Sequence, residues 1–218
     1  MQITRILKSK KPYFEVEINN GENKIKTTLD VISLLNLNKG KQLSANGLKT
    51  IKKETNISLA KLLAIKTVSK KQVSEHELTQ KLSNANINER ELSKIKNRLK
   101  NLGYLNDTAY AKETYALLLE KGKGPEFIDN YLDQKGIDTE TIKSAKENTI
   151  LNDEQQIKQI KALIKKKFDL KSATTNYDFA KLLAFFLRKG FTEQIILKAL
   201  KELGITGDED YADQTSTY

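Results

Sequence analysis

The sequence contains no cysteine and only one histidine among its 218 residues. The absence of cysteine excludes a disulfide framework, thiolate chemistry and cysteine-based zinc sites. His76 lies between Glu75 and Glu77 at a predicted helix start, where a solvated side chain is a simpler interpretation than a general base or a metal ligand. We therefore expect a protein that is not an enzyme, with no catalytic residues, no metal site and no cofactor.

Proline and long hydrophobic runs are also scarce. The only prolines are Pro12 and Pro125, and so few helix breakers in a chain rich in Leu, Lys, Glu, Asn and Ile favour helix. No segment approaches the ~18 consecutive apolar residues of a membrane span, and residues 1–10 lack the apolar run of a secretory signal. The sequence predicts a cytoplasmic monomer with no membrane partner.

Positive charge is abundant, since 38 Lys and Arg face 28 Asp and Glu and give a net charge of +10. This excess favours an anionic partner, either nucleic acid or an acidic protein surface. Residues 207–210 are acidic, so the remaining chain is more basic than the total suggests. Any one basic cluster fits a solvated face, but the recurrence of such clusters at the junctions of the predicted repeats favours a shared, salt-sensitive binding face. The candidate contact residues are Lys70, Lys71, Lys121, Lys123, Lys135, Lys165, Lys166, Lys167, Arg188 and Lys189.

The first thirty residues have the pattern of a small β subdomain. Residues 14–19 alternate apolar and polar side chains, which is typical of a half-buried strand. Asn20-Gly21 tolerates the positive φ of a hairpin turn, residues 24–27 predict the returning strand, and residues 3–7 can form a first strand. Asp30 is then expected to cap a short helix. Because an isolated hairpin is only marginally stable, this subdomain should pack on the rest of the chain.

From residue 46 the periodicity is helical. Ser74 and Glu77 have the spacing of a capping box, and Asn88 begins a further helix that Gly103 ends as a left-handed C-cap. The predicted core stripe of the helix after residue 46 comprises Leu48, Ile51, Thr55, Leu59 and Leu62. The predicted stripe of the helix after Asn88 comprises Leu92, Ile95, Leu99 and Leu102.

A helix–turn–helix segment recurs three times along the chain. In each copy a helix ends at a residue that accepts positive φ, an apolar residue follows at once, and an N-cap residue comes next. The copies are Leu82–Asn88, Leu132–Asp138 and Phe186–Thr192, which are offset by 50 and 54 residues. Two downstream apolar positions also align: Leu92, Ile142 and Ile196 at one, and Ile95, Ala145 and Ala199 at the other.

The repeat predicts the architecture. Residues 108–120 and 154–167 supply a further helix before the second and third copies. We expect a mainly α fold of three tandem three-helix repeats that form an elongated, curved array, preceded by a small N-terminal β-hairpin subdomain. The expected divisions are residues 1–45 (hairpin and short helix), 46–105, 106–152 and 153–205 (the three repeats), and 206–218 (an acidic, flexible tail).

Three segments invite a more specific chemistry. Gly122-Lys123-Gly124 resembles a phosphate loop but lacks its leading glycine and its trailing Lys-Ser/Thr, so we interpret it as a helix-to-helix turn with Pro125 at the first helical position. Asp129 and Asp133 could meet a metal, although a solvated face is the simpler interpretation. The apolar run 179–187 predicts a buried helix packed on most sides rather than a ligand box.

Several motifs together resemble the RecX family of RecA regulators. Ser74-Glu75-His76-Glu77-Leu78 with Lys81-Leu82 is similar to its first signature, and residues 103–111 are similar to its second and most specific one. Lys123-Gly124-Pro125 through Leu132, with Lys135-Gly136-Ile137, resembles the third. The signature residues, whose roles are mainly structural, are Ser74, Glu77, Leu78, Gly103, Tyr104, Asp107, Ala111, Gly124 and Gly136.

The resemblance covers nearly the whole chain and has specific implications. It implies three three-helix repeats that lie in the groove of the RecA filament on single-stranded DNA. There the protein would inhibit or modulate ATP hydrolysis, strand exchange and the SOS response. One departure is Lys71-Gln72-Val73, where family members usually carry arginines, so a bidentate contact there is in doubt. From the residues alone, direct binding to single- or double-stranded DNA remains the alternative.

Overall fold

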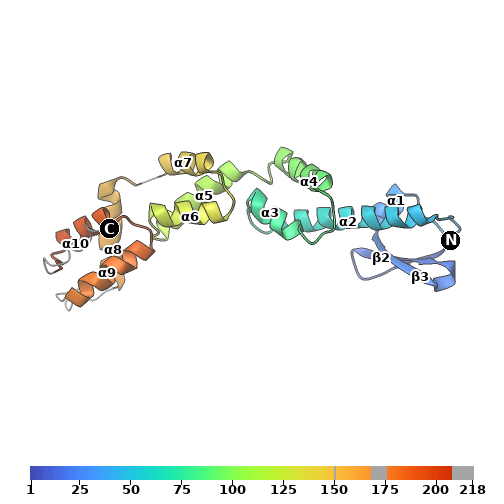
Figure 1. The fold of residues 1–218 in the computed structure, drawn as a ribbon, viewed down its shortest axis with the longest axis horizontal. Coiled ribbons are helices and arrows are strands. Elements are labelled where there is room, and N and C mark those ends of the chain that lie inside the picture. Colours follow the sequence, from blue (N-terminus) through green and yellow to red (C-terminus); the bar gives the residue numbers. More distant parts are fainter. Residues whose placement is uncertain (150, 168–175, 208–218) are drawn as a thin grey trace, which may run out of the picture. The chain divides into compact units, whose positions relative to one another are not determined.

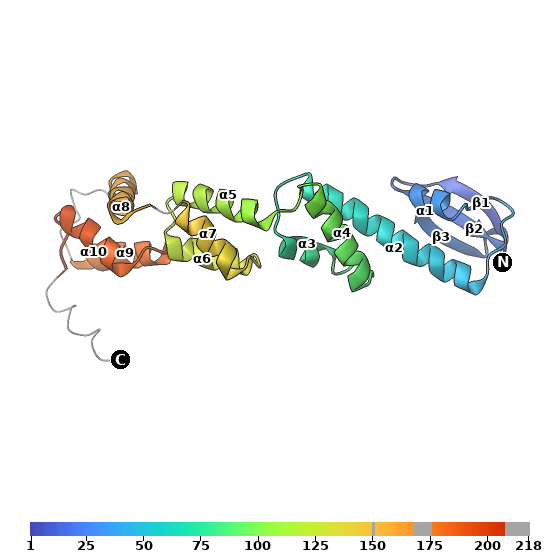
Figure 2. The ribbon, with the colours of Figure 1, turned by 90° about the horizontal axis from the view of Figure 1, so that it is seen from above.

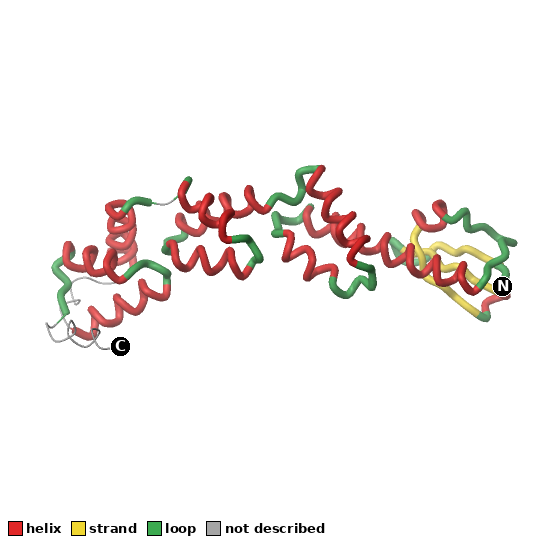
Figure 3. Tube along the Cα trace, turned by 45° about the horizontal axis from the view of Figure 1, so that its top comes forward, coloured by secondary structure: helices red, strands yellow, loops and turns green. Residues whose placement is uncertain are grey.

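The computed structural model describes residues 1–149, 151–167 and 176–207, and the acidic tail predicted at 206–218 lies almost wholly outside them. The chain divides into two compact units, residues 1–106 and residues 107–218 (Figure 1). In the described part of both units, no helix is long and apolar enough to cross a membrane. Among the described residues strands are confined to the N-terminal subdomain, and helices form the rest (Figure 3).

The N-terminal subdomain is a three-stranded antiparallel sheet. Its strands are β1 (Ile3–Lys8), β2 (Tyr13–Ile18) and β3 (Asn23–Thr28), in the order β1-β2-β3. Asn20 and Gly21 lie between β2 and β3 with φ of 57° and 98°, which explains the hairpin signal in the sequence. The predicted hairpin and first strand are therefore confirmed.

The short helix α1 (Leu29–Leu34) follows β3, but it is not capped as expected. Its N-cap residue is Thr28, whose side chain makes no capping hydrogen bond, and Asp30 lies inside the first turn. The prediction that Asp30 is the cap was wrong by two positions. A carboxylate in the first turn still favours the helix electrostatically, which accounts for the misleading signal.

A single long helix, α2 (Ala45–Val68), belongs to two cores. Its first half packs on the sheet, where Ile51 lies in the same hydrophobic core as Val16 of β2. The Thr55 hydroxyl lies 2.7 Å from the Thr27 hydroxyl of β3 in a buried hydrogen bond. The second half packs instead on the helices that follow, through Ala60 and other small residues (Figure 2). The subdomain thus packs on the rest of its unit, as expected of a small sheet.

This change of partner makes the predicted stripe of α2 only half correct. Leu48, Ile51 and Thr55 face the sheet, but Leu62, in the same stripe, has 39% of its surface exposed. The buried apolar residues in the second half are Ile57, Ala60 and Ala64, which lie on a different side of the helix, whereas buried Ser58 accepts a hydrogen bond from the Thr28 hydroxyl (2.9 Å). A periodicity argument assumes one buried face, whereas this helix has two.

The first repeat is completed by α3 (Glu75–Leu82) and α4 (Glu89–Asn101). The core includes Leu92, Ile95 and Leu99, as predicted, but Leu102 is 58% exposed and does not belong to the stripe. The Gly103 N–H donates to Lys100 O (2.9 Å) and the Tyr104 N–H donates to Leu99 O (2.9 Å), which is the hydrogen-bond pattern of a Schellman cap. Gly103 has a φ of 75°, which confirms the predicted helix end.

The second unit contains two further groups of three helices, each with its own core. The first group is α5 (Asp107–Glu120), α6 (Pro125–Gln134) and α7 (Thr139–Glu147). The second group is α8 (Asp153–Lys167), α9 (Asn176–Arg188) and α10 (Glu193–Glu202). The helix α9 buries Leu182 and Phe186 but exposes Lys181 and Leu187, so the expectation of a helix packed on most sides was wrong.

The three copies of the helix–turn–helix segment have matching local structure. The residues Asn86, Gly136 and Gly190 all have positive φ, and Gly136 and Gly190 lie two residues after the ends of α6 and α9. The prediction that the first helix ends at Asn86 was wrong, because α3 ends at Leu82 and the Ala85 N–H already donates to Leu82 O. Their N-caps also correspond, although only Asn88 and Asp138 accept the predicted side-chain hydrogen bond, and Thr192 does not. The aligned apolar positions are all buried: Leu92, Ile142, Ile196, Ile95, Ala145 and Ala199. The domain boundaries stay predictions.

Candidate partner-binding surfaces

Charge is divided unevenly between the two units. Residues 1–106 contain 21 Lys and Arg against 9 Asp and Glu, a net charge of +12. Residues 107–218 contain 17 Lys and Arg against 19 Asp and Glu, a net charge of −2. The positive potential that could attract an anionic partner therefore belongs to the first unit. Local basic clusters in the sequence do not reveal this division.

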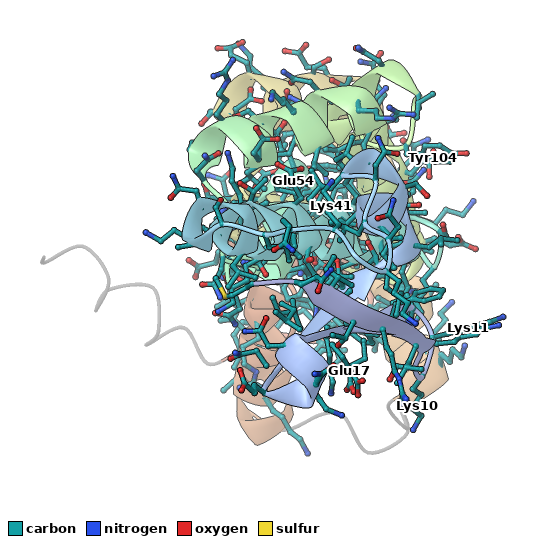
Figure 4. The ribbon with its side chains drawn as sticks, turned by 90° about the vertical axis from the view of Figure 1, so that its right-hand side faces the viewer. Lys10, Lys11, Glu17, Lys41, Glu54 and Tyr104 are labelled. Atoms are coloured by element: carbon teal, nitrogen blue, oxygen red, sulfur yellow. The ribbon has the colours of Figure 1, made fainter. Side chains whose placement is uncertain are left out.

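The predicted basic pair in the first unit is exposed. Lys70 and Lys71 lie in the connection between α2 and α3, and the Lys71 ammonium is 3.9 Å from the Glu77 carboxylate. An ion pair this long and this exposed stabilises a protein by less than ~1 kcal/mol, so it would yield readily to an anionic ligand. Further lysines of this unit, Lys10 and Lys11, project from the turn between β1 and β2 (Figure 4).

Two turns of the second unit contact each other, and four of the predicted cations lie in or beside them: Lys121, Lys123, Arg188 and Lys189. The turn between α5 and α6 contacts the turn between α9 and α10: the Gly124 N–H donates to Lys189 O (2.6 Å), and the Glu126 N–H donates to Gly190 O (3.1 Å). Carbonyl groups at the end of α9 thereby satisfy N–H groups at the start of α6, and the two helix dipoles meet with opposite ends. We call this contact the glycine joint and define it by Gly122, Gly124 and Gly190.

The glycine joint changes the interpretation of its lysines. The Lys189 ammonium donates to Gly122 O (3.1 Å), and the Lys123 ammonium lies 3.6 Å from the centroid of the Phe127 ring. Both side chains therefore take part in internal contacts. The N–H groups that a phosphate loop would offer to a ligand are occupied by protein carbonyls, so the interpretation of residues 122–124 as a turn is confirmed.

The other predicted cations are spread over the second unit. Lys121 and Arg188 are exposed beside the glycine joint, and Lys135 lies 5.2 Å from the centroid of the Tyr131 ring. Lys165 and Lys166 are exposed at the end of α8. Lys167 ends that helix, and its side chain lies outside the described residues.

The motif at residues 74–78 has a clear local role. The Ser74 hydroxyl accepts a hydrogen bond from the Glu77 N–H (3.1 Å), and the Glu77 carboxylate accepts one from the Ser74 N–H (3.4 Å). This is the predicted capping box, and Leu78 is fully buried behind it. These three side chains fix the start of α3.

The remaining motif residues differ in exposure. Ala111 is fully buried in the core of the second repeat, and Asp107 is the first residue of α5. Gly136 has a φ of 71° and ends the segment after α6. In contrast, the Tyr104 side chain is 59% exposed beside Gly103 (Figure 4). Among the motif residues, Tyr104 therefore presents a large exposed side chain to another molecule.

Ion pairs join α3 to α4. The Glu75 carboxylate accepts from the Lys96 ammonium at 3.1 Å and also pairs with Lys100. Partial burial by itself would raise the pKa of Glu75, but the hydrogen bonds from Lys100 and Lys96 outweigh it, so the pKa lies below its ordinary value. Glu75 therefore stays ionised and ties the two helices together, while the exposed His76 ring lies 2.9 Å from the Gln80 side-chain amide in a hydrogen bond.

Asp129, considered above as a metal ligand, is held in an internal network. Its carboxylate accepts from the Tyr115 hydroxyl (3.1 Å) and from the Lys146 ammonium (2.6 Å). Burial raises the pKa of Tyr115, and the charge of Asp129 raises it further, so the phenol remains a hydrogen-bond donor. Asp133 is exposed. In the described part of the chain, no group of three metal-ligating side chains comes together.

The second half of α2 carries an apolar surface that was not predicted from the sequence. Leu62 and Leu63 are 39% and 40% exposed, and Leu59 beside them is half-buried. We call Leu59, Leu62 and Leu63 the α2 stripe. The signal was present in the sequence, because the predicted core stripe included Leu59 and Leu62, but nothing indicated that the sheet would end before reaching them.

Known proteins resemble this chain over most of its length. The "Regulatory protein RecX" of Streptococcus agalactiae serotype V is 32% identical over 211 residues, which are 96% of this chain and 80% of that protein. The protein of the same name from Enterococcus faecalis is 28% identical over 215 residues, 97% of this chain and 79% of its own length. The chain matches no protein-family model.

Solved structures agree in fold. A crystal structure of a regulatory protein RecX superposes with a TM-score of 0.62 at 21% identity, covering 93% of this chain and 98% of that one. The structure of RecX from Lactobacillus salivarius superposes with a TM-score of 0.59 at 27% identity, covering 69% of this chain and 98% of that one. Both units described above therefore have a counterpart among solved structures.

Proposed function

Because the chain belongs to the RecX family of regulatory proteins, we propose that it regulates the RecA recombinase by binding the recombinase filament on single-stranded DNA. The observation that carries this proposal is the 32% identity over 96% of the chain, which includes all three helical repeats. Bound there, the protein would slow ATP hydrolysis and strand exchange by the recombinase and thereby modulate the SOS response. We further propose that it acts as a cytoplasmic monomer without catalysis of its own.

The construction of the repeats supports a binding role. Each repeat has a separate hydrophobic core, so the side chains on its outer helix faces are not needed for folding and can serve to contact a partner. The first unit adds a net charge of +12, which would be attracted to acidic protein surfaces and to the DNA phosphates of a filament. The fully buried Tyr115 side chain donates to Asp129, which also accepts from Lys146, so these three side chains are engaged within the repeat.

The first test measures ATP hydrolysis by the recombinase on single-stranded DNA while this protein is added. We expect hydrolysis to slow several-fold when the protein is well below one molecule per DNA binding site. The reason is that one regulator bound to a filament affects several recombinase subunits rather than one. A DNA-dependent ATPase unrelated to the recombinase, on the same DNA, should be unaffected. Inhibition that appears only at DNA-saturating concentrations would contradict the proposal and indicate competition for DNA.

A second candidate function, direct binding of the chain to DNA, is favoured by the charge of the first unit. If three to five phosphates of duplex DNA are contacted, log K should fall with log salt at a slope of about −2.7 to −4.5, which is roughly a 6- to 20-fold loss between 0.1 and 0.2 M salt. Fluorescence anisotropy of labelled DNA without recombinase measures this slope. Negligible binding at physiological salt would exclude the candidate.

Two pairs of exposed lysines provide a matched comparison for DNA binding. Lys70→Gln/Lys71→Gln removes a pair from the basic first unit, and Lys165→Gln/Lys166→Gln removes a pair from the second unit. We expect the first change to reduce the salt slope by up to about 2 and the second to leave it unchanged. Equal effects of the two changes would contradict the assignment of binding to the first unit.

A further inference from the structure

The second half of α2 presents an apolar face that the sheet leaves uncovered. The helix has 24 residues and is therefore about 36 Å long, whereas each strand has six residues and spans about 20 Å. Figure 2 shows α2 leaving the sheet and continuing to α3 and α4. Leu48, Ile51 and Thr55 face the sheet, and the same face continues as Leu59 and Leu62 beyond it.

The α2 stripe is a group of neighbours rather than scattered leucines. Leu59, Leu62 and Leu63 are related by steps of three and four residues and so share one side of the helix. Ile65, at the edge of this side, is 54% exposed. The repeat core lies on another side, where Ala60 and Ala64 allow α3 and α4 to approach closely. Several adjacent, partly exposed aliphatic side chains of this kind are typical of a protein interface.

The charges around the stripe define what could cover it. Lys52 and Lys66 lie seven residues before and after Leu59, which is about two helical turns, so they lie on the same side at its two ends. Both are exposed, and no acidic residue occurs between Glu54 and Glu75. In the described part of the chain neither lysine has a carboxylate at ion-pair distance. A second copy of this chain would bring together two units of charge +12, which disfavours self-association through this face.

We propose that the α2 stripe is a docking surface for an amphipathic helix of a partner protein, with leucine-like residues on its apolar side and carboxylates at its edges. The aliphatic side chains of such a helix would pack along Leu59, Leu62 and Leu63 in the manner of a helix in a groove. Its carboxylates would meet Lys52 and Lys66. This surface is an addition to the regulatory function proposed above, and its test requires neither recombinase nor DNA.

The test uses the full chain and a labelled synthetic peptide that forms a helix of about four turns, with leucine at i, i+4 and i+7 and glutamate beside them. A second peptide carries lysine in place of glutamate. We expect the full chain to bind the glutamate peptide at least ~10-fold more tightly than the lysine peptide, and this preference to shrink in 1 M salt. Fluorescence anisotropy measures both affinities.

The decisive variant is Leu62→Gln/Leu63→Gln, with Leu187→Gln/Leu197→Gln as its matched control. The control leucines lie on α9 and α10 and are 43% and 39% exposed, close to the 39% and 40% of the stripe. The stripe variant lacks the two leucine side chains that the wild type would bury on binding, so it should bind the glutamate peptide at least ~10-fold more weakly. The control should bind like the wild type. Circular dichroism should give the same helix content for all three proteins.

Four results would overturn the proposal. The first is that the wild-type chain does not bind the glutamate peptide, and the second is that the stripe variant binds it as tightly as the control does. The third is a wild-type dimer in sedimentation that Leu62→Gln/Leu63→Gln converts to monomer, because a second copy would then be the occupant. The fourth is tighter peptide binding after Asp208→Asn/Glu209→Gln/Asp210→Asn, because the acidic C-terminal segment of the chain itself would then cover the stripe.

Discussion

Gly190→Ala is expected to lower the free energy of unfolding of the second unit by about 3–5 kcal/mol. Gly190 has a φ of 82°, which costs an L-residue about 1–3 kcal/mol. An added Cβ would also overlap the backbone nitrogen of Phe127, which cannot move away as a flexible side chain could. The turns of the glycine joint would have to separate, with loss of the hydrogen bonds from Gly124 and Glu126.

The matched control for this change is Gly204→Ala. Gly204 has a φ of 72° in the same unit, but no atom lies within 4 Å of the position of an added Cβ. It should therefore show the cost of the backbone conformation alone, about 1 kcal/mol. Urea denaturation followed by circular dichroism measures both values. A Gly190→Ala protein no less stable than Gly204→Ala would mean that the glycine joint does not form in solution.

Phe186→Ala should have a comparable effect, with a loss of about 3–5 kcal/mol. The Phe186 side chain is fully buried, and its ring meets the rings of Phe185 and Phe191 edge-on at centroid distances of 5.0 and 5.9 Å. Removal of the ring leaves a cavity that the surrounding helices can fill only in part. The same unfolding experiment gives the value.

Leu187→Ala is the control for Phe186→Ala, since Leu187 is the next residue of α9 and is 43% exposed. It should cost at most about 1 kcal/mol. Hydrogen exchange adds a spatial readout, because Phe186→Ala should weaken the protection of α8 to α10 while the amides of α2 and α4 keep theirs. Equal losses of stability in the two variants would place Phe186 outside the core and refute the packing described here.

The repeat could be predicted from the sequence because its signals are local. The turns at Gly136 and Gly190 depend on positive φ, and the caps at Asn88 and Asp138 depend on a side chain three residues from its partner. Interactions of this kind are complete within a few residues, so the residues themselves specify them. The aligned core positions and the N-caps at Asn88 and Asp138 were predicted correctly for this reason.

The features that could not be predicted depend on contacts between distant segments. The two buried sides of α2 follow from where the sheet ends, and the internal role of Lys189 follows from a contact with Gly122. From the sequence, Lys189 is simply a cation and Leu62 is simply a leucine at helical spacing. Neither the internal hydrogen bond of Lys189 nor the exposure of Leu62 can be inferred from that. Six of the ten predicted binding residues are exposed, as a binding role requires: Lys70, Lys71, Lys121, Lys165, Lys166 and Arg188. Whether any of the ten contacts a partner stays a prediction.

The long helix α2 has a consequence for how the first unit melts. One continuous run of backbone hydrogen bonds from Ala45 to Val68 supplies side chains to the core under the sheet and to the core of the first repeat. Loss of either core removes the packing that holds half of this helix, and a helix of about 12 residues is marginal in water by itself. The sheet and the first repeat therefore form a single cooperative folding unit, in which neither part can open far without the other.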